Sequence, residues 1–188
     1  MGDMTDLKTA EKELEALYQQ REKVLPLQRK AVRDSSLAIR QVQVGNLGEA
    51  EKMAAGIKAQ IDEMEKLVAK WPRLAGQLNT PYQEYAELMV LLSVVKTGKV
   101  PSLDVPPEAY LTGTLDAIGE LKRVCMELLA SGKTAEAVAL FKTMEEVYYS
   151  MQGYAFPDSI VPGLKAKQDA MKALLERLHS TLAEARAR

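Results

Sequence analysis

The stretch PYQEYAELMVLLSVVK, residues 81–96, decides the class of fold. Thr80 and Pro81 form a start signal, because a capping residue followed by proline is typical of the first turn of a helix. After Glu87 the stretch is apolar almost all round. A helix that is hydrophobic on every side is buried among other elements, so the segment predicts the central helix of a bundle.

Segments on both sides of this central stretch carry apolar residues at three- and four-residue intervals, the period of a half-buried helix. A very long first helix is expected from Asp6 to about Val44, bent or interrupted at Pro26. The remaining helices are expected over residues 47–71 and 108–130, between turns at 131–134 and 153–163, and from 164 onward. No β-alternation of useful length is present. The predicted fold class is all-α, a bundle of six to seven helices.

Length and composition agree with one helical domain over residues 1–188. Hydrophobic residues make up 47% of the chain and aromatic residues only 5%, as expected for a globular protein rich in helix formers. The 25 Lys and Arg residues balance 26 Asp and Glu residues, for a net charge of -1. The whole chain therefore exerts no electrostatic pull on nucleic acid or membrane, and a polyanion site must come from local clustering.

The expected location is the cytoplasm. The single cysteine, Cys125, excludes an internal disulfide and a cysteine-rich zinc site, and it suits a reducing compartment. The N-terminal residues are charged throughout, which does not fit a signal peptide. The longest apolar stretch, Leu88–Val95, is too short to span a membrane, so no membrane partner is expected.

Four acidic residues occupy unusually apolar surroundings. Glu84 and Glu87 are three positions apart on the central segment, and Asp116 and Glu120 are four apart on the next, so each pair shares one helical face. Residues 78–95 and 101–121 contain no Lys or Arg, which leaves these acids without a local cation. Buried carboxylates need neutralisation.

A bound Mg²⁺ or Mn²⁺ ion would neutralise these acids, because an all-oxygen ligand set suits a hard cation. Such an ion would polarise a phosphoryl oxygen and activate water for phosphodiester hydrolysis. The alternative is that the acids are solvated or paired with distant Lys and Arg side chains, which is common for glutamate on helices.

A basic stretch in the first helix could contact phosphates. Residues 21–43 hold six cations against two acids, and Arg29, Arg33 and Arg40 recur at intervals of four and seven. They therefore share a helical face. The stripe is either a set of nucleic-acid contacts or a solvated surface.

Two other sequence features resemble parts of known sites but do not support one. Gly132-Lys133-Thr134 resembles the end of a phosphate-binding loop, but Glu127 stands where that motif needs glycine and no strand precedes it. His179 is the only histidine, so one chain can form neither a Ser-His-Asp triad nor a histidine-containing di-iron site.

The stretch EAYLTGTLDAIGELKRVCMELLASG, residues 108–132, resembles the signature of the translin superfamily. The resemblance extends to QEYAEL at 83–88, RKAVRDSSLAIR at 29–40 and PGLKAKQD at 162–169, in the family's order. The compact length is similar to that of archaeal members. Lys133-Thr134, where many relatives are acidic, and Pro26 depart from the pattern.

The resemblance implies a metal-dependent ribonuclease, because Trax-type members of the family have that activity. Carried over by motif, their carboxylates fall on Glu84, Glu87, Asp116 and Glu120, as catalytic residues and ligands of Mg²⁺ or Mn²⁺. The family's basic positions fall on Arg29, Arg33 and Arg40. The expected substrate is single-stranded RNA, with single-stranded DNA bound as well, and the expected assembly is a homo-octamer with the acids facing its interior.

Two alternatives remain open at this stage. Translin-type members mainly bind single-stranded RNA and DNA, so the chain could be a binding protein without catalysis. It could also be an adaptor bundle whose acids are paired across helices, which would show no metal effect on stability and no salt-dependent RNA binding.

Overall fold

The computed structural model describes residues 5–186, and every regular element in that range is helical. The elements are α1 (Thr5–Gln43), α2 (Leu47–Val68), the 3-10 helix η1 (Pro72–Leu78), α3 (Asn79–Thr97), α4 (Pro107–Ala130), α5 (Thr134–Met151) and α6 (Leu164–Arg186). The predicted all-α bundle with a long first helix is confirmed. None of the helices within 5–186 combines the length and apolar character that a membrane span requires.

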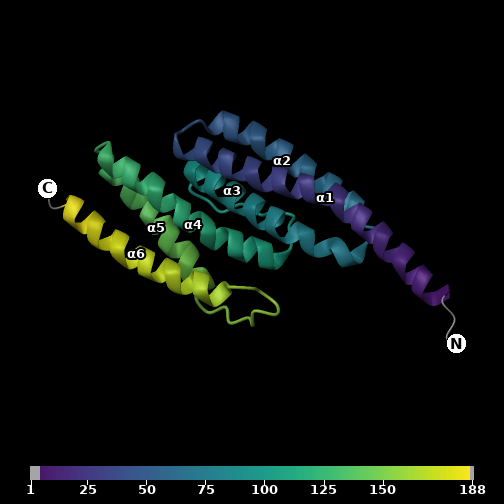
Figure 1. Ribbon diagram of the computed structural model, residues 1–188. Coiled ribbons are helices and arrows are strands. Elements are labelled where there is room, and N and C mark those ends of the chain that lie inside the picture. The colour runs from purple at the N-terminus through teal and green to yellow at the C-terminus, as the bar shows by residue number, and fades with distance from the viewer. Residues whose placement is uncertain (1–4, 187–188) are drawn as a thin grey trace.

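Helix α3 is the centre of the bundle, as its apolar sequence predicts (Figure 1). It packs against α1, α2, α4 and α5, and its residues Leu88, Val90 and Leu91 are almost completely buried. The helix ends at Gly98, whose φ of 70° and bond to the Val94 carbonyl form a left-handed cap that favours glycine.

The other helices form two groups on either side of the contact between α3 and α4. Helices α1 and α2 lie together on one side of α3, and α5 and α6 pack against α4 on the other (Figure 1). The acids at residues 84–120 therefore lie where the two halves of the bundle meet.

The structure corrects three local expectations. The segment expected as a connection contains η1, and α3 begins at Asn79, two residues before Pro81. Helix α1 continues through Pro26 without interruption. Pro26 and Glu22, the residue whose carbonyl loses its helical partner, are both exposed, so water can bind that carbonyl.

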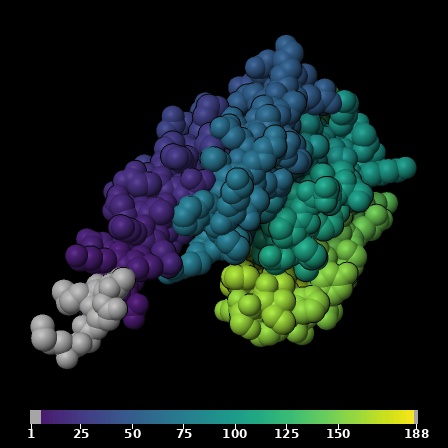
Figure 2. All heavy atoms as spheres, turned by 90° about the vertical axis from the view of Figure 1, so that its right-hand side faces the viewer, coloured from purple at the N-terminus to yellow at the C-terminus, as the bar shows by residue number. Residues whose placement is uncertain are grey.

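The first turns of α1 extend beyond the bundle in Figure 1, and Figure 2 shows the same end of the molecule with these turns in purple. Leu7, Leu14 and Tyr18, which share the apolar spacing of the first helix, are 67%, 54% and 53% exposed. Periodicity identified the helix correctly, but this part of its apolar face has no neighbouring helix to bury it.

Candidate functional site

Helices α3 and α4 bring the four predicted acids to one region of the molecule. Glu84 and Glu87 lie in the first half of α3, and Asp116 and Glu120 lie in the middle of α4, which packs directly against it. The negative charges of Glu84, Asp116 and Glu120 all act on the carboxyl group of Glu87. The sequence prediction that the two pairs come together is therefore supported by the geometry of the fold.

Gly113 permits the close contact between the two helices. A Cβ atom at this position would lie 2.6 Å from the Gln83 carbonyl oxygen and 2.9 Å from both the Glu87 amide nitrogen and the Ala86 Cβ. Two of these atoms belong to the backbone of α3 and cannot move aside like a flexible side chain. Gly113 thus sets the separation of the helices one turn from Asp116.

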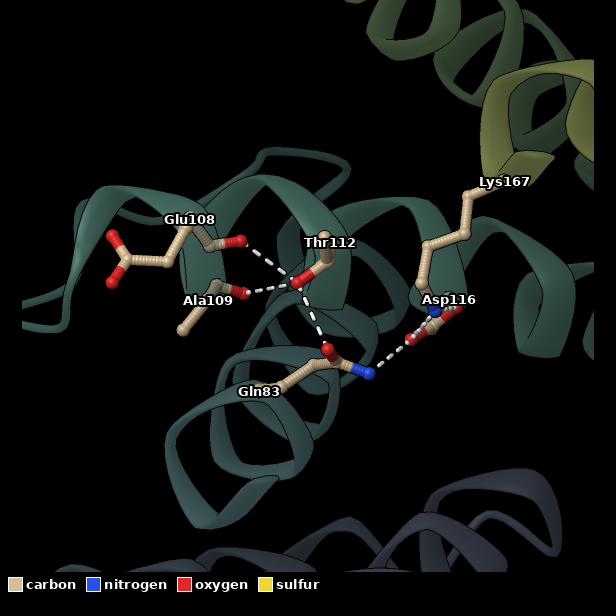
Figure 3. Close-up of polar contacts among 6 residues, drawn as sticks. All are labelled: Gln83, Glu108, Ala109, Thr112, Asp116 and Lys167. Atoms are coloured by element: carbon tan, nitrogen blue, oxygen red, sulfur yellow. Dashed lines mark hydrogen bonds and ion pairs between the residues drawn. The ribbon is translucent and has the colours of Figure 1, made fainter. Parts of the chain in front are cut away.

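Asp116 is held by two side chains from other helices (Figure 3). The Lys167 ammonium on α6 donates to Oδ1 at 2.5 Å and to Oδ2 at 2.6 Å, and the Gln83 amide donates to Oδ2 at 2.9 Å. The Gln83 amide oxygen accepts a hydrogen bond from the Thr112 hydroxyl at 3.0 Å. This bond orients the amide so that its nitrogen faces Asp116. Asp116 is therefore paired with a lysine that is distant in sequence, as the alternative for these acids expects.

Glu120 is held from the side of α1. Gln43, the last residue of α1, donates its amide hydrogen to the Glu120 carboxylate. Its amide oxygen accepts a hydrogen bond from Arg123 at 3.2 Å. Gln43 therefore couples an acid on α4 to a cation one turn further along the same helix.

Glu84 and Glu87 have neither a hydrogen bond nor an ion pair with any side chain in residues 5–186. Burial raises the pKa of Glu84, the charge of Asp116 raises it further, and Lys167 opposes the rise. Burial and the neighbouring charges of Glu84, Asp116 and Glu120 raise the pKa of Glu87 to about 8. Glu87 is therefore largely protonated at neutral pH in this arrangement, because burial and the nearby acids outweigh the opposing charge of Lys167.

A cavity of about 760 Å³ opens beside these acids. Glu84, Glu87 and Glu120 line one part of it, and Arg40 and Arg123 line another. Asp116, turned toward Lys167, is not among the lining residues. The cavity thus presents carboxylates and guanidinium groups to the same space, which suits a ligand that carries both a phosphate and a bound cation.

The predicted basic stripe is exposed along α1, and only one of its three members reaches this cavity. Arg40 lines the cavity, whereas Arg29 and Arg33 lie earlier on α1 and do not. None of the three arginines forms an ion pair or a side-chain hydrogen bond with another described residue. Their guanidinium groups are therefore available to an external anion.

The donor set fits a hard divalent cation, but the side chains are not gathered around one point. Within residues 5–186, no three Asp, Glu, His or Cys side chains are arranged as a ready metal site. Glu84 and Glu87 offer half-buried carboxylate oxygens with no other cation bound to them, as Mg²⁺ or Mn²⁺ ligands require. Asp116 and Glu120 would have to turn away from Lys167 and Gln43 to join them.

Four residues of the site have no role in the sequence prediction. Lys167 and Gln43 come from α6 and α1, and their contacts span 51 and 77 positions of sequence. Lys167, Gln83 and Arg123 all lie within stretches marked by the resemblance, and Gln83 and Arg123 also lie within three positions of a predicted acid, which was a usable signal.

Comparison with known proteins finds relatives over most of the chain. The Translin family profile matches residues 85–184. Protein MJ0175 of Methanocaldococcus jannaschii, which is uncharacterized, is 32% identical over 167 residues, covering 86% of this chain and 74% of MJ0175. The crystal structure of AfC3PO superposes with a TM-score of 0.89 at 29% identity, covering 97% of both chains.

Two further structures extend the comparison. AfC3PO in complex with duplex RNA gives a TM-score of 0.89 at 28% identity, again over 97% of both chains. Apo-NeC3PO gives a TM-score of 0.83 at 20% identity over 98% of both chains, a likeness that shows the fold alone.

Proposed function

This chain belongs to the Translin family, and we propose that it is a Mg²⁺- or Mn²⁺-dependent endoribonuclease that acts on single-stranded RNA. One observation carries the proposal. Glu84 and Glu87 are half-buried carboxylates with no cation bound among the described residues, and they line a cavity shared with Arg40 and Arg123. Unpaired buried carboxylates reduce stability, so their presence beside a basic cavity wall calls for a cationic ligand.

Each acid has a role in the proposal. Glu84, Glu87 and Asp116 hold the cation through their carboxylate oxygens, and Glu120 is a further ligand or orients the attacking water. A Mg²⁺ or Mn²⁺ ion held there would supply Lewis-acid chemistry, that is, polarisation of a phosphoryl oxygen and activation of water for hydrolysis. The rise in the pKa of Glu87 means that it must release its proton before it can act as a ligand.

The arginines bind the RNA backbone. Arg40 and Arg123 face the cavity and hold the phosphates nearest the reacting one. Arg29 and Arg33, further along α1, contact more distant phosphates. Contacts to phosphates carry no sequence information, so affinity falls as salt rises and base preference is weak.

Assembly of several copies supplies the avidity that a chain of net charge -1 needs. The exposed apolar side chains of Leu7, Leu14 and Tyr18 support a homo-oligomer, because an apolar stripe on a projecting helix is typical of an interface. An octamer is the state proposed from the family. Single-stranded DNA is proposed as a second ligand that binds the same basic stripe.

A binding protein without catalysis is the second candidate, and one observation favours it. Asp116 and Glu120 already have partners in Lys167 and Gln43, and the acids are not gathered as ligands. The complex of AfC3PO with duplex RNA supports RNA binding under either candidate, and it makes duplex RNA a necessary competitor in the test.

Cleavage of end-labelled RNA separates the two candidates. Single-stranded and duplex RNA are incubated with the protein in Mg²⁺, in Mn²⁺ and in EDTA, together with Glu87→Gln and Asp116→Asn. Glu127→Gln is the matched control, since Glu127 lines the same cavity but is exposed and lies outside the four acids. We expect metal-dependent cutting of single strands that falls at least about 100-fold in the first two variants and is unchanged in the third. RNA binding without cutting in any metal would establish the binding protein instead.

A further inference from the structure

We propose that Lys167 is a resident counter-ion of Asp116 that a divalent cation must displace, so that this lysine limits metal affinity. The inference rests on the metal-dependent function proposed above. It concerns a residue on α6 that lies outside the four acids and the basic stripe.

The contacts of Asp116 leave few positions for another cation. One ammonium group contacts both carboxylate oxygens, and the Gln83 amide contacts Oδ2 as well (Figure 3). A carboxylate has about four lone-pair positions, two on each oxygen. Lys167 and Gln83 occupy three of them, and a bidentate ion would need those that Lys167 holds.

The positive charge of Lys167 also opposes the binding of a divalent cation. Lys167 is the cation that acts on both Glu84 and Glu87, in addition to its direct pairing with Asp116. A divalent ion among these acids would stand close to the ammonium group and repel it. Both members of the ion pair are about a quarter exposed, so the freed lysine can extend into water rather than remain buried without a partner.

The metal-free protein gains from the pairing. Without Lys167, Asp116 would add a further uncompensated carboxylate beside Glu84 and Glu87. The lysine thus compensates the charge of Asp116, to which the Gln83 amide also donates.

Mn²⁺ titration by calorimetry or electron paramagnetic resonance, without RNA, tests the inference. Lys167→Met removes the ammonium and keeps the length of the side chain. Lys165→Met is the matched control, because Lys165 lies two residues earlier on α6, is exposed and pairs with Asp169. We expect about tenfold tighter Mn²⁺ binding in Lys167→Met and no change in Lys165→Met. Lys167→Arg, which keeps the charge, should bind Mn²⁺ no more tightly than the wild type.

A double-mutant cycle shows whether the effect passes through Asp116. In the Asp116→Asn background, Lys167→Met should tighten Mn²⁺ binding less than it does in the wild type, because only the repulsion between the ammonium group and the ion is then removed. Thermal melts in EDTA identify a variant that fails to fold. Addition of Mn²⁺ should raise the Tm of Lys167→Met more than that of the wild type.

The outcomes distinguish this inference from the function it rests on. Mn²⁺ binding to wild type with equal or weaker binding to Lys167→Met would overturn the inference and leave the proposed function standing. If neither the wild type nor any variant binds Mn²⁺, both the inference about Lys167 and the proposed function are overturned.

Discussion

The acids on α3 and the acids on α4 face the same region, but their surroundings differ. Glu84 and Glu87 contact no cation or hydrogen-bond donor among the described residues, and burial raises the pKa of both. Asp116 and Glu120 each accept hydrogen bonds from a residue on another helix, Lys167 and Gln43. One pair therefore lacks a hydrogen-bond or ion-pair partner among the described residues, whereas the other pair has such partners.

This difference gives the two pairs different parts in the metal site that we propose. In that proposal the α3 pair would attract the ion, since neither acid is paired with a Lys or Arg side chain among the described residues. The α4 pair is held by polar side chains that solvent or an incoming ligand can replace. The close approach at Gly113 keeps the two pairs within electrostatic reach of each other.

Gly113→Ala should have the largest effect on stability, because it would separate the two pairs. The new methyl group would meet backbone atoms of α3 at 2.6 and 2.9 Å, so the helices must move apart. We expect a loss of roughly 3 kcal/mol in the free energy of unfolding, which lowers Tm by about 6–12 °C.

Gly119→Ala provides the matched control on the same helix. Its Cβ would meet only the end of Met171 at 3.8 Å, an ordinary contact. The added methyl should leave stability unchanged or raise it by up to about 1 kcal/mol, since alanine favours helix. Equal melting temperatures for the two variants would contradict the role given to Gly113.

Asp116→Asn and Glu87→Gln should change stability in opposite directions. Asp116→Asn breaks a partly buried ion pair, and we expect a loss of roughly 1–3 kcal/mol in EDTA. Glu87→Gln removes a carboxyl group that is unfavourable when ionised, and we expect a gain of roughly 1–2 kcal/mol at pH 7.5. Urea unfolding of the metal-free proteins measures both, and a change of the same sign in both would remove the distinction between the pairs.

The pH dependence of stability sharpens the prediction for Glu87. Its pKa is about 8 in the folded protein, above the ordinary glutamate value of 4.5. Between these values the folded state binds more protons than the unfolded state, so wild-type stability falls as pH rises from about 4.5 to 8. The advantage of Glu87→Gln should be absent near pH 4 and should grow up to pH 8. A difference that is independent of pH would assign the effect to packing instead.

Arg40→Gln and Arg29→Gln should have the smallest effects, both on RNA affinity. Each substitution removes one phosphate contact. The logarithm of the RNA association constant should then fall less steeply with the logarithm of the salt concentration, by about one unit of slope or less. Because Arg40 lines the cavity of the acids and Arg29 does not, only Arg40→Gln should also slow cleavage. Fluorescence anisotropy at several salt concentrations measures the first effect, and single-turnover cleavage measures the second. Equal cleavage rates would place the reacting phosphate away from this cavity.

Much of the fold follows from local sequence patterns. The apolar stretch after Glu87 predicts the buried central helix, and the three- and four-residue spacing predicts the others, because side-chain periodicity is a local property. The exposure of Leu7 and Leu14 could not be predicted, since it depends on how far the neighbouring helices extend. The 3-10 helix at Pro72–Leu78 lacks a long periodic pattern and was expected as a connection.

The sequence predicts the acids of the candidate site, but it does not predict the side chains that bind them. The absence of Lys and Arg near the acids in sequence agrees with Glu84 and Glu87, neither of which forms an ion pair within residues 5–186. Asp116 instead follows the alternative that the acids pair with distant cations, because Lys167 reaches it from a helix 51 positions away. Such a contact depends on the packing of α6 against α4, which no local pattern encodes.

Anomalous diffraction from crystals grown with Mn²⁺ tests the central claim most directly. The account predicts a manganese peak bounded by the carboxylates of Glu84, Glu87 and Asp116, with the Lys167 ammonium turned away from Asp116. Crystals with Mn²⁺ bound elsewhere, or with these acids still in their metal-free positions at saturating Mn²⁺, would contradict it.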